Sequence, residues 1–198
     1  MNIQKSLLLI SVVLGLSACA SNTQSIKYYS LGLNGIQDSN DAIQANQVRV
    51  VVAPIQLAKF LNQNNMVMQI GEHEIYKANF HRWAEPLDQS ISKLLVQKLN
   101  NKKSNAYQFV KSNEYMTENS SLHLSLEIDQ FHSTDNAQVI LSGHYWLHNK
   151  EKSFASMKHF SISEQLTRDG YHHSVEKLKG LLGQLANQIV DSIRQHRV

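Results

Sequence analysis

The chain has 198 residues, of which 42% are hydrophobic and only two are proline, and these proportions indicate an ordered globular protein. The formal net charge is only +3, and no lysine or arginine run is longer than Lys102-Lys103, so the sequence is not typical of a nucleic-acid-binding protein. Cys19 is the single cysteine, which excludes an intrachain disulfide.

The N-terminal residues have the pattern of a bacterial lipoprotein signal. Lys5 precedes an apolar stretch from Leu7 to Leu16, which is shorter than the roughly 20 residues that a membrane-spanning helix needs. The stretch ends in Leu16-Ser17-Ala18-Cys19, a small-residue triplet followed by cysteine. We therefore predict that residues 1–18 are a signal peptide and are removed.

Cys19 is the predicted lipid anchor, carrying covalent diacylglycerol and an N-acyl chain such as palmitate. Several acyl chains together hold a protein on a membrane, whereas one gives only marginal binding. The alternative, a secretory signal cut near Ser17 or Ala20, would leave a free thiol in an oxidising compartment. Neither Ala20 nor Ser21 is the aspartate that commonly retains lipoproteins at the inner membrane. The predicted location is therefore the periplasmic face of a Gram-negative outer membrane.

Residues 19–47 are predicted to be a lipidated tether with one short strand. The segment from Ser21 to Gln47 is polar, apart from an aromatic and β-branched stretch, Ile26 to Leu31, that favours a strand. The main domain is expected to span residues 48–198. It begins with a buried, central strand from Val48 to Ala53, which Pro54 ends.

Three further elements are predicted before residue 101. A short helical turn is expected at Leu57–Leu61. Met66–Ile70 and Glu74–Lys77, with Gly71 between them, are expected to form a hairpin. A helix should begin at Pro86, carry Asp88 in its first turn and end near Asn100. Its apolar residues recur at helical spacing and should pack on a sheet: Leu87, Ile91, Leu94, Leu95 and Leu99.

The second half of the chain predicts an antiparallel meander followed by a helix. Leucine and isoleucine alternate with polar residues from Leu122 to Asp129, as expected for a strand with one buried face. Strands at Val139–Leu147 and Phe154–Ile162 should follow, joined by a turn over residues 148–152. The final helix is expected at Ser174–Gln195. The predicted fold is therefore α+β, a single layered domain with a mostly antiparallel sheet packed by two long helices.

The sequence offers little that is typical of catalysis or metal binding. His144 and His148 should share one face of a strand, and His172 and His173 are adjacent, but their spacing matches no metal motif. Ser-x-x-Lys occurs twice without the companion elements of penicillin-interactive enzymes. We therefore predict no catalytic residue, no metal site and no cofactor beyond the lipid on Cys19.

Trp83, Trp146 and His172 are the candidate partner-binding residues. Trp83 lies just before the first helix, where it could wedge that helix onto the sheet or contact a partner; both interpretations stay open. Trp146 is expected on the outer face of its strand, where an exposed tryptophan is a common interface anchor.

Several colinear motifs give the chain a close resemblance to the PqiC/YmbA family of ABC-type transport auxiliary lipoproteins, also called intermembrane transport lipoproteins. Their order and spacing, rather than any single motif, carry the resemblance. After the lipobox they are Tyr28-Tyr29-Ser30-Leu31, Val50 to Ile55, Leu57 to Leu61, Met66-Val67-Met68, Arg82 to Leu87, Ile128 to Phe131, Val139 to Gly143 and Asp169-Gly170-Tyr171.

The resemblance implies a fold like the N-terminal domain of TolB-like periplasmic proteins and no active site. It also implies a role in lipid transport between membranes and in envelope integrity. The expected partners are a periplasm-spanning MCE-domain protein, its inner-membrane component and the outer membrane, with the domain acting as a docking piece in a homo-oligomeric ring. The alternative is a lipid-binding carrier, with an acyl chain held in a cavity lined by Leu181, Leu185 and Ile189.

Overall fold

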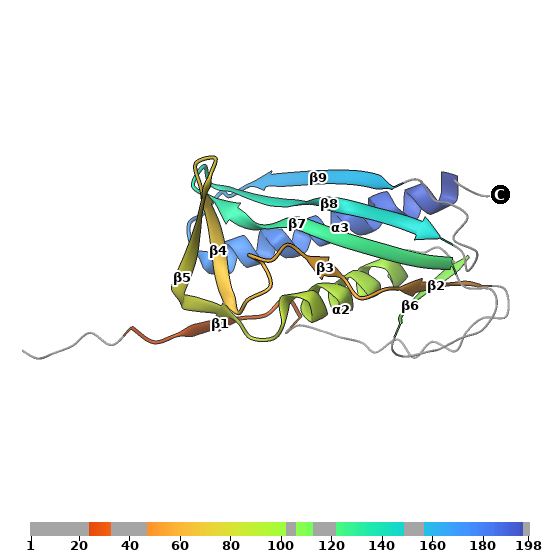
Figure 1. Ribbon diagram of the computed structural model, residues 1–198, viewed down its shortest axis with the longest axis horizontal. Helices are drawn as coiled ribbons and strands as arrows, with labels where there is room; N and C mark the ends of the chain where they lie inside the picture. The colour runs from red at the N-terminus through yellow and green to blue at the C-terminus, as the bar shows by residue number, and fades with distance from the viewer. Residues whose placement is uncertain (1–23, 33–46, 102–105, 113–121, 149–156, 196–198) are drawn as a thin grey trace, which may run out of the picture.

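The computed structural model describes residues 24–32, 47–101, 106–112, 122–148 and 157–195. Over these residues the fold is α+β, as predicted: a mixed sheet of nine strands with two helices on one side of it (Figure 1). None of the described helices is long and apolar enough to cross a membrane.

The strand β7, Leu122–Thr134, is the longest in the sheet and its structural axis. One edge pairs antiparallel with β8, Gln138–His148, which in turn pairs antiparallel with β9, Lys158–Gln165. This is the predicted meander. β7 extends five residues beyond the predicted end because Phe131, after a bulge, returns to the buried face. β9 lies a few residues later than predicted, and the start of the predicted strand falls outside the described residues.

The other edge of β7 pairs with three parallel strands in succession: β2 (Val48–Val52), β3 (Gln56–Leu57) and β4 (Asn65–Ile70). The segment that contains β2, β3 and β4 thus runs beside β7 as one strand with two interruptions. β2 is central, as predicted, because its other edge pairs with β6, Tyr107–Lys111, which the sequence analysis missed. The turn predicted at Leu57–Leu61 is present but begins one residue later: Leu57 belongs to β3, and in the turn that follows Leu61 N–H donates to the Ala58 carbonyl.

The predicted hairpin is present, and its second strand is longer than expected. β5 spans Glu74–Trp83 and pairs antiparallel with β4. The pairing of β4 with β5 is irregular between Asn65 and Val67, where β5 contains extra residues. Asn65 stabilises this irregular part, because its Nδ2 donates to the Ala78 carbonyl at 2.8 Å. β1, Lys27–Tyr29, pairs parallel with the end of β5. β1 and the buried Leu31 therefore pack with the domain, although they lie in the segment expected to be tether.

The helix α2, Leu87–Asn100, follows Pro86 and buries every residue of its predicted apolar face. It packs against α3 and β6. Asn100 joins the end of α2 to β6, because its side chain donates to the Phe109 carbonyl at 2.8 Å and accepts from the Phe109 amide at 2.9 Å.

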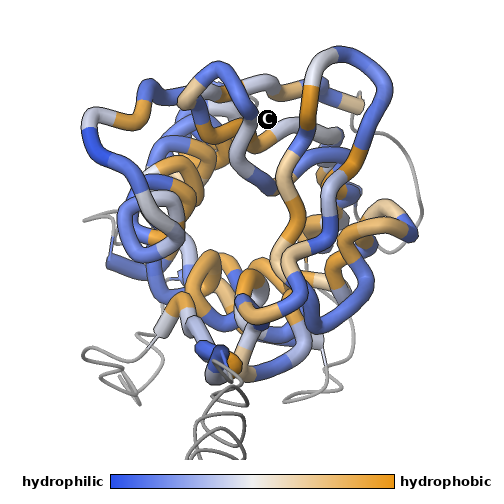
Figure 2. The backbone as a smooth tube through the Cα atoms, turned by 90° about the vertical axis from the view of Figure 1, so that its left-hand side faces the viewer, coloured by the Kyte–Doolittle hydropathy of each residue, from blue (hydrophilic) through white to orange (hydrophobic). Residues whose placement is uncertain are grey.

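The helix α3, Tyr171–Gln195, begins three residues before the predicted start and packs against β7, β8 and β9. Seen along the molecule from the β1 and β5 end, the hydrophobic segments of both helices lie on their inner sides (Figure 2). The apolar face of α3 is fully buried, with Leu181, Leu182, Leu185 and Ile189 at 0% exposure.

Candidate functional surfaces

The outer face of β7, β8 and β9, on the side away from the helices, carries most of the polar candidates. Alternation along β8 directs Leu141 and Tyr145 into the core and places His144, Trp146 and His148 on the opposite face. The predicted shared face of His144 and His148 is confirmed. Trp146 is half-buried there, opposite Ser125 of β7.

Histidines form two cross-strand pairs on this outer face. The rings of His123 and His148 stack with centroids 5.2 Å apart, and those of His144 and His159 meet edge to face at 5.1 Å. Asp129 lies 3.4 Å from His144, measured from Oδ2 to Nδ1. Among the described residues, no group of three or more histidine, cysteine or acidic side chains is arranged to hold a metal ion.

Beneath this face, a buried polar contact joins the sheet to the end of α3. Tyr145 Oη lies 2.6 Å from Ser192 Oγ, and Lys158 Nζ donates to the same oxygen at 3.1 Å. The contact satisfies two hydroxyl groups that are buried in the core. It therefore fixes the position of the last turn of α3 against β8 and β9.

A second cluster of polar aromatic residues lies where β1, β5 and the start of α3 meet. The His81 and Tyr171 rings stack with centroids 3.7 Å apart, and Tyr29 Oη lies 2.9 Å from His81 Nδ1, to which it donates when that nitrogen carries no proton. Burial, and secondarily the charge of Lys27, lowers the pKa of His81, while burial raises the pKa of both Tyr29 and Tyr171. The cluster therefore favours neutral side chains and fastens β1 to α3.

Trp83 lies in the core, with 6% of its surface exposed and its ring centroid 6.3 Å from that of Phe131. Its amide donates to the Asn64 carbonyl at 2.7 Å. Of the two roles that the sequence left open for Trp83, this position favours the wedge between helix and sheet. A side chain so deeply buried presents no surface to a partner.

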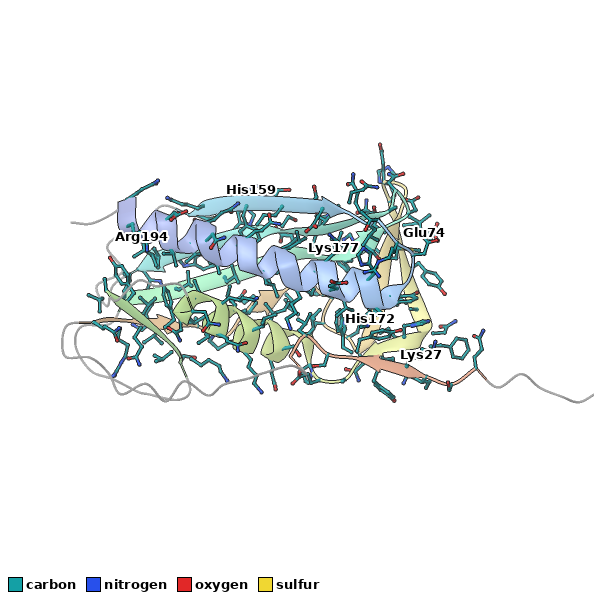
Figure 3. All side chains as sticks on the ribbon, turned by 180° about the vertical axis from the view of Figure 1, so that it is seen from behind. Lys27, Glu74, His159, His172, Lys177 and Arg194 are labelled. Carbon is teal, nitrogen blue, oxygen red and sulfur yellow. The ribbon has the colours of Figure 1, made fainter. Side chains whose placement is uncertain are left out.

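The adjacent histidines of α3 point in different directions: His172 is exposed and His173 is buried. His173 organises the first turn, because its Nε2 accepts from the Thr167 amide at 3.4 Å and its Nδ1 donates to Glu176 Oε2 at 3.2 Å. This hydrogen bond, supported by the charge of Arg168, lowers the pKa of Glu176. His172 is the exposed member of the turn (Figure 3).

The structure does not bring the three candidate partner-binding residues together. His172 lies in the first turn of α3, at the β4 and β5 end of the molecule (Figures 1 and 3). Trp146 lies near the last residue of β8, which runs toward the opposite end (Figure 1). Cys19 falls outside the described residues.

Sequence reasoning missed one surface feature, a group of exposed apolar side chains on β1 and β5. Tyr28 is 62% exposed, and Ile26 and Phe80 are 41% and 40% exposed. The alternation Ile26-Lys27-Tyr28 could have indicated it, had Phe80 been placed on the neighbouring strand.

Comparison with known proteins relates the whole of this fold to one family. Residues 29–190 match the family of ABC-type transport auxiliary lipoprotein components. The chain is 27% identical over 191 residues to the intermembrane transport lipoprotein PqiC of Escherichia coli K12, covering 96% of this chain and 98% of the relative, and equally similar to PqiC of Shigella flexneri.

Solved structures of similar fold include a crystal structure of an uncharacterized protein, with a TM-score of 0.72 and 22% identity, covering 85% of this chain and 99% of that one. A protein from Xanthomonas campestris has a TM-score of 0.64 and 12% identity, covering 87% of this chain and 95% of the other. At such identities the likeness concerns the fold alone.

Proposed function

The chain belongs to the family of ABC-type transport auxiliary lipoprotein components, and we propose that it is the outer-membrane lipoprotein of an MCE-type intermembrane transport system. The observation that carries this proposal is the extent of the match, which spans residues 29–190 and so covers the fold from β1 into α3. The relatives named intermembrane transport lipoprotein match over nearly their full length.

The proposed mechanism is tethering and alignment rather than chemistry. The lipids on Cys19 hold the domain at the periplasmic face of the outer membrane, and the rigid α+β body binds the periplasm-spanning MCE-domain protein, whose inner-membrane component supplies the cargo. Lipid would then pass between the membranes without crossing water. Copies of the domain would surround the partner as a homo-oligomeric ring.

Trp146 and His172 remain the proposed contacts for partners, because their side chains are at least partly accessible on the surface. They lie at different ends of the fold, so we assign them to different neighbours: Trp146 to the MCE-domain protein and His172 to an adjacent copy in the ring. Trp83 is withdrawn from this set because it is buried.

The carrier alternative gains no support from the described core. It requires Leu181, Leu185 and Ile189 to line a space for an acyl chain, and all three are 0% exposed within one continuous hydrophobic cluster. Side chains in such a cluster fill the space between helix and sheet. Lipid that co-purifies with protein lacking the anchor would favour the carrier instead.

Two substitutions near the predicted anchor test the proposal. Cys19→Ala removes the acylated sulfur, and Ala20→Asp keeps it but introduces the residue that commonly retains lipoproteins at the inner membrane. We expect both variants to leave the outer-membrane fraction and to fail to restore envelope integrity in a deletion strain. Ser25→Ala, at an exposed position just before β1, is the matched control. Full function of the Cys19→Ala variant would show that anchoring is not its role.

A further inference from the structure

Three exposed apolar side chains gather on one side of the β1–β5 pair: Ile26, Tyr28 and Phe80, here called the β1–β5 patch. They are 41%, 62% and 40% exposed, respectively. Single apolar residues on a surface are ordinary, but a contiguous group of large ones on a small sheet edge marks a contact site.

Strand geometry explains why the three side chains share one side. β1 and β5 are parallel and Tyr28 is in register with Arg82, so the side chains of Tyr28 and Arg82 lie on the same side of the pair. Phe80 lies two residues before Arg82 in β5, and Ile26 lies two residues before Tyr28, just ahead of β1, so alternation places both on the side of Tyr28. The other side carries Tyr29, His81 and the buried Trp83, and it faces α3.

The patch faces away from the body of the molecule. The β4–β5 hairpin stands across one end of the fold, and α3 begins behind it and runs to the opposite end (Figure 1). The inner side of β5 contacts α3 through the His81–Tyr171 stack, so its outer side points outward from that end.

The charged side chain in the patch is positive. Arg82 lies in the same row as Tyr28, whereas Lys27 is in register with His81 and so projects from the other side of the pair, although it is exposed. Glu74 is at the far end of β5, six residues or roughly 20 Å from Phe80 along the strand. Figure 3 shows Lys27 of β1 and Glu74 at opposite ends of this part of the fold. Tyrosine, phenylalanine and isoleucine next to arginine form a combination that suits a lipid headgroup boundary.

The length of chain before β1 places this surface close to lipid. Cys19 precedes Ile26 by seven residues, which span at most about 25 Å when fully extended. Ile26, at the start of the patch, therefore lies within that distance of Cys19, whereas α3 ends at the opposite end of the fold.

We propose that the β1–β5 patch is a membrane-seating surface, which inserts Ile26, Tyr28 and Phe80 into the phospholipid headgroup region and directs Arg82 to lipid phosphates. This inference rests on the proposed lipid anchor and deepens it: the anchor holds the protein on the bilayer, and the patch sets the orientation. The β1–β5 end then faces the membrane, and the end where α3 finishes faces the periplasm.

The test places a fluorescent probe on the patch of the lipidated protein. Cys19 is the only natural cysteine and is acylated in the mature chain, so Tyr28→Cys or Phe80→Cys supplies a single reactive thiol for an environment-sensitive label. Gln188→Cys, exposed on α3, is the matched control. The labelled proteins are reconstituted in vesicles of phosphatidylethanolamine and phosphatidylglycerol, and quenching by doxyl-labelled lipid is compared with quenching by aqueous iodide.

We expect labels at positions 28 and 80 to be quenched by doxyl lipid and protected from iodide, and the label at position 188 to behave in the opposite way. Labels at 28 and 80 that iodide quenches as fully as the control would overturn the inference. Protection from both quenchers, with disulfide cross-links between copies at position 28, would assign the patch to a second copy and also overturn it. Vesicle flotation is scored separately: a protein that floats with an unprotected patch contradicts only this inference, whereas one that does not float contradicts the anchor as well.

Discussion

Gly143 occupies a position in β8 where a larger side chain does not fit. It lies in β8 opposite the irregularity in β7, and a Cβ atom there would stand 2.0 Å from the Glu127 carbonyl oxygen. That oxygen belongs to the backbone of the central strand, so it cannot move aside without disturbing the pairing of β7 with β8.

We therefore expect Gly143→Ala to lower the free energy of unfolding by about 3 kcal/mol or more, the scale of severe overpacking. Gly180→Ala is the matched control, because its Cβ would meet nothing closer than Glu164 Oε2 at 3.8 Å on an exposed position of α3. It should raise stability by about 0.5–1 kcal/mol. Urea denaturation measures both; equal effects of the two substitutions would refute the assignment.

His132 makes folding sensitive to acid. It is 2% exposed, its Nδ1 donates to the Ser133 carbonyl at 3.0 Å, and burial lowers its pKa despite that hydrogen bond. As the pH falls, His132 is therefore protonated at a higher pH in the unfolded chain than in the folded protein. Stability is complete above the ordinary histidine pKa of about 6.5 and falls as the pH drops below it, by at most about 1.4 kcal/mol per pH unit for each such group.

Replacing His132 with phenylalanine should reduce the loss of stability between roughly pH 8 and pH 5. His81, whose pKa is also lowered, remains in the variant, so a smaller dependence of the same sign should persist. His73→Asn, at a side chain that is 92% exposed, serves as the control and should leave the profile unchanged. An unchanged profile in His132→Phe would show that this imidazole does not titrate with folding.

At the scale of elements, β1 is held by its parallel pairing with β5, and Tyr171 links this pair of strands to α3. Its ring stacks on His81 at 3.7 Å and lies 6.1 Å from that of Tyr29, between centroids. Beyond the ladder between β1 and β5, the Ala84 amide donates to the Tyr29 carbonyl at 2.8 Å. α3 itself is fixed by its long buried face.

Tyr171→Ala should therefore loosen β1 while α2 and α3 stay folded. Hydrogen–deuterium exchange should rise in residues 27–29 and at Ala84, and remain unchanged in the helices. His172→Ala, one residue along and exposed, is the control. Exchange that rises equally throughout the helices would mean that Tyr171 supports the whole fold rather than β1.

The elements that the sequence predicted well are those whose pattern is local. The helical spacing of Leu87 to Leu99 identified both the extent and the buried face of α2, and strict alternation identified the start of β7. β3 and β6 were missed because they are short and depend on distant partners, β7 and β2. The same limit applies to Phe80, whose exposure follows from the unpredicted length of β5.

For the whole molecule, the class of fold and the family could be predicted from the sequence, because the lipobox and the family's motifs follow one another along the chain in the family's order. It could not decide between the two roles of Trp83, since burial results from the packing of β5 and β7. Nor could it show that Trp146 and His172 lie at different ends, because this depends on the direction of β8 relative to α3. The functional surfaces are thus properties of the assembled fold.

Photo-crosslinking in intact cells tests the docking role most directly. A photoreactive amino acid is placed at position 146 or 172 of the full-length protein, with position 188 as the control, and the adducts are identified by mass spectrometry. We predict that position 146 forms a dominant adduct with an MCE-domain protein, that position 172 cross-links to another copy, and that position 188 does neither. Adducts at position 146 only with lipid or with further copies of this chain would contradict docking of an MCE-domain partner.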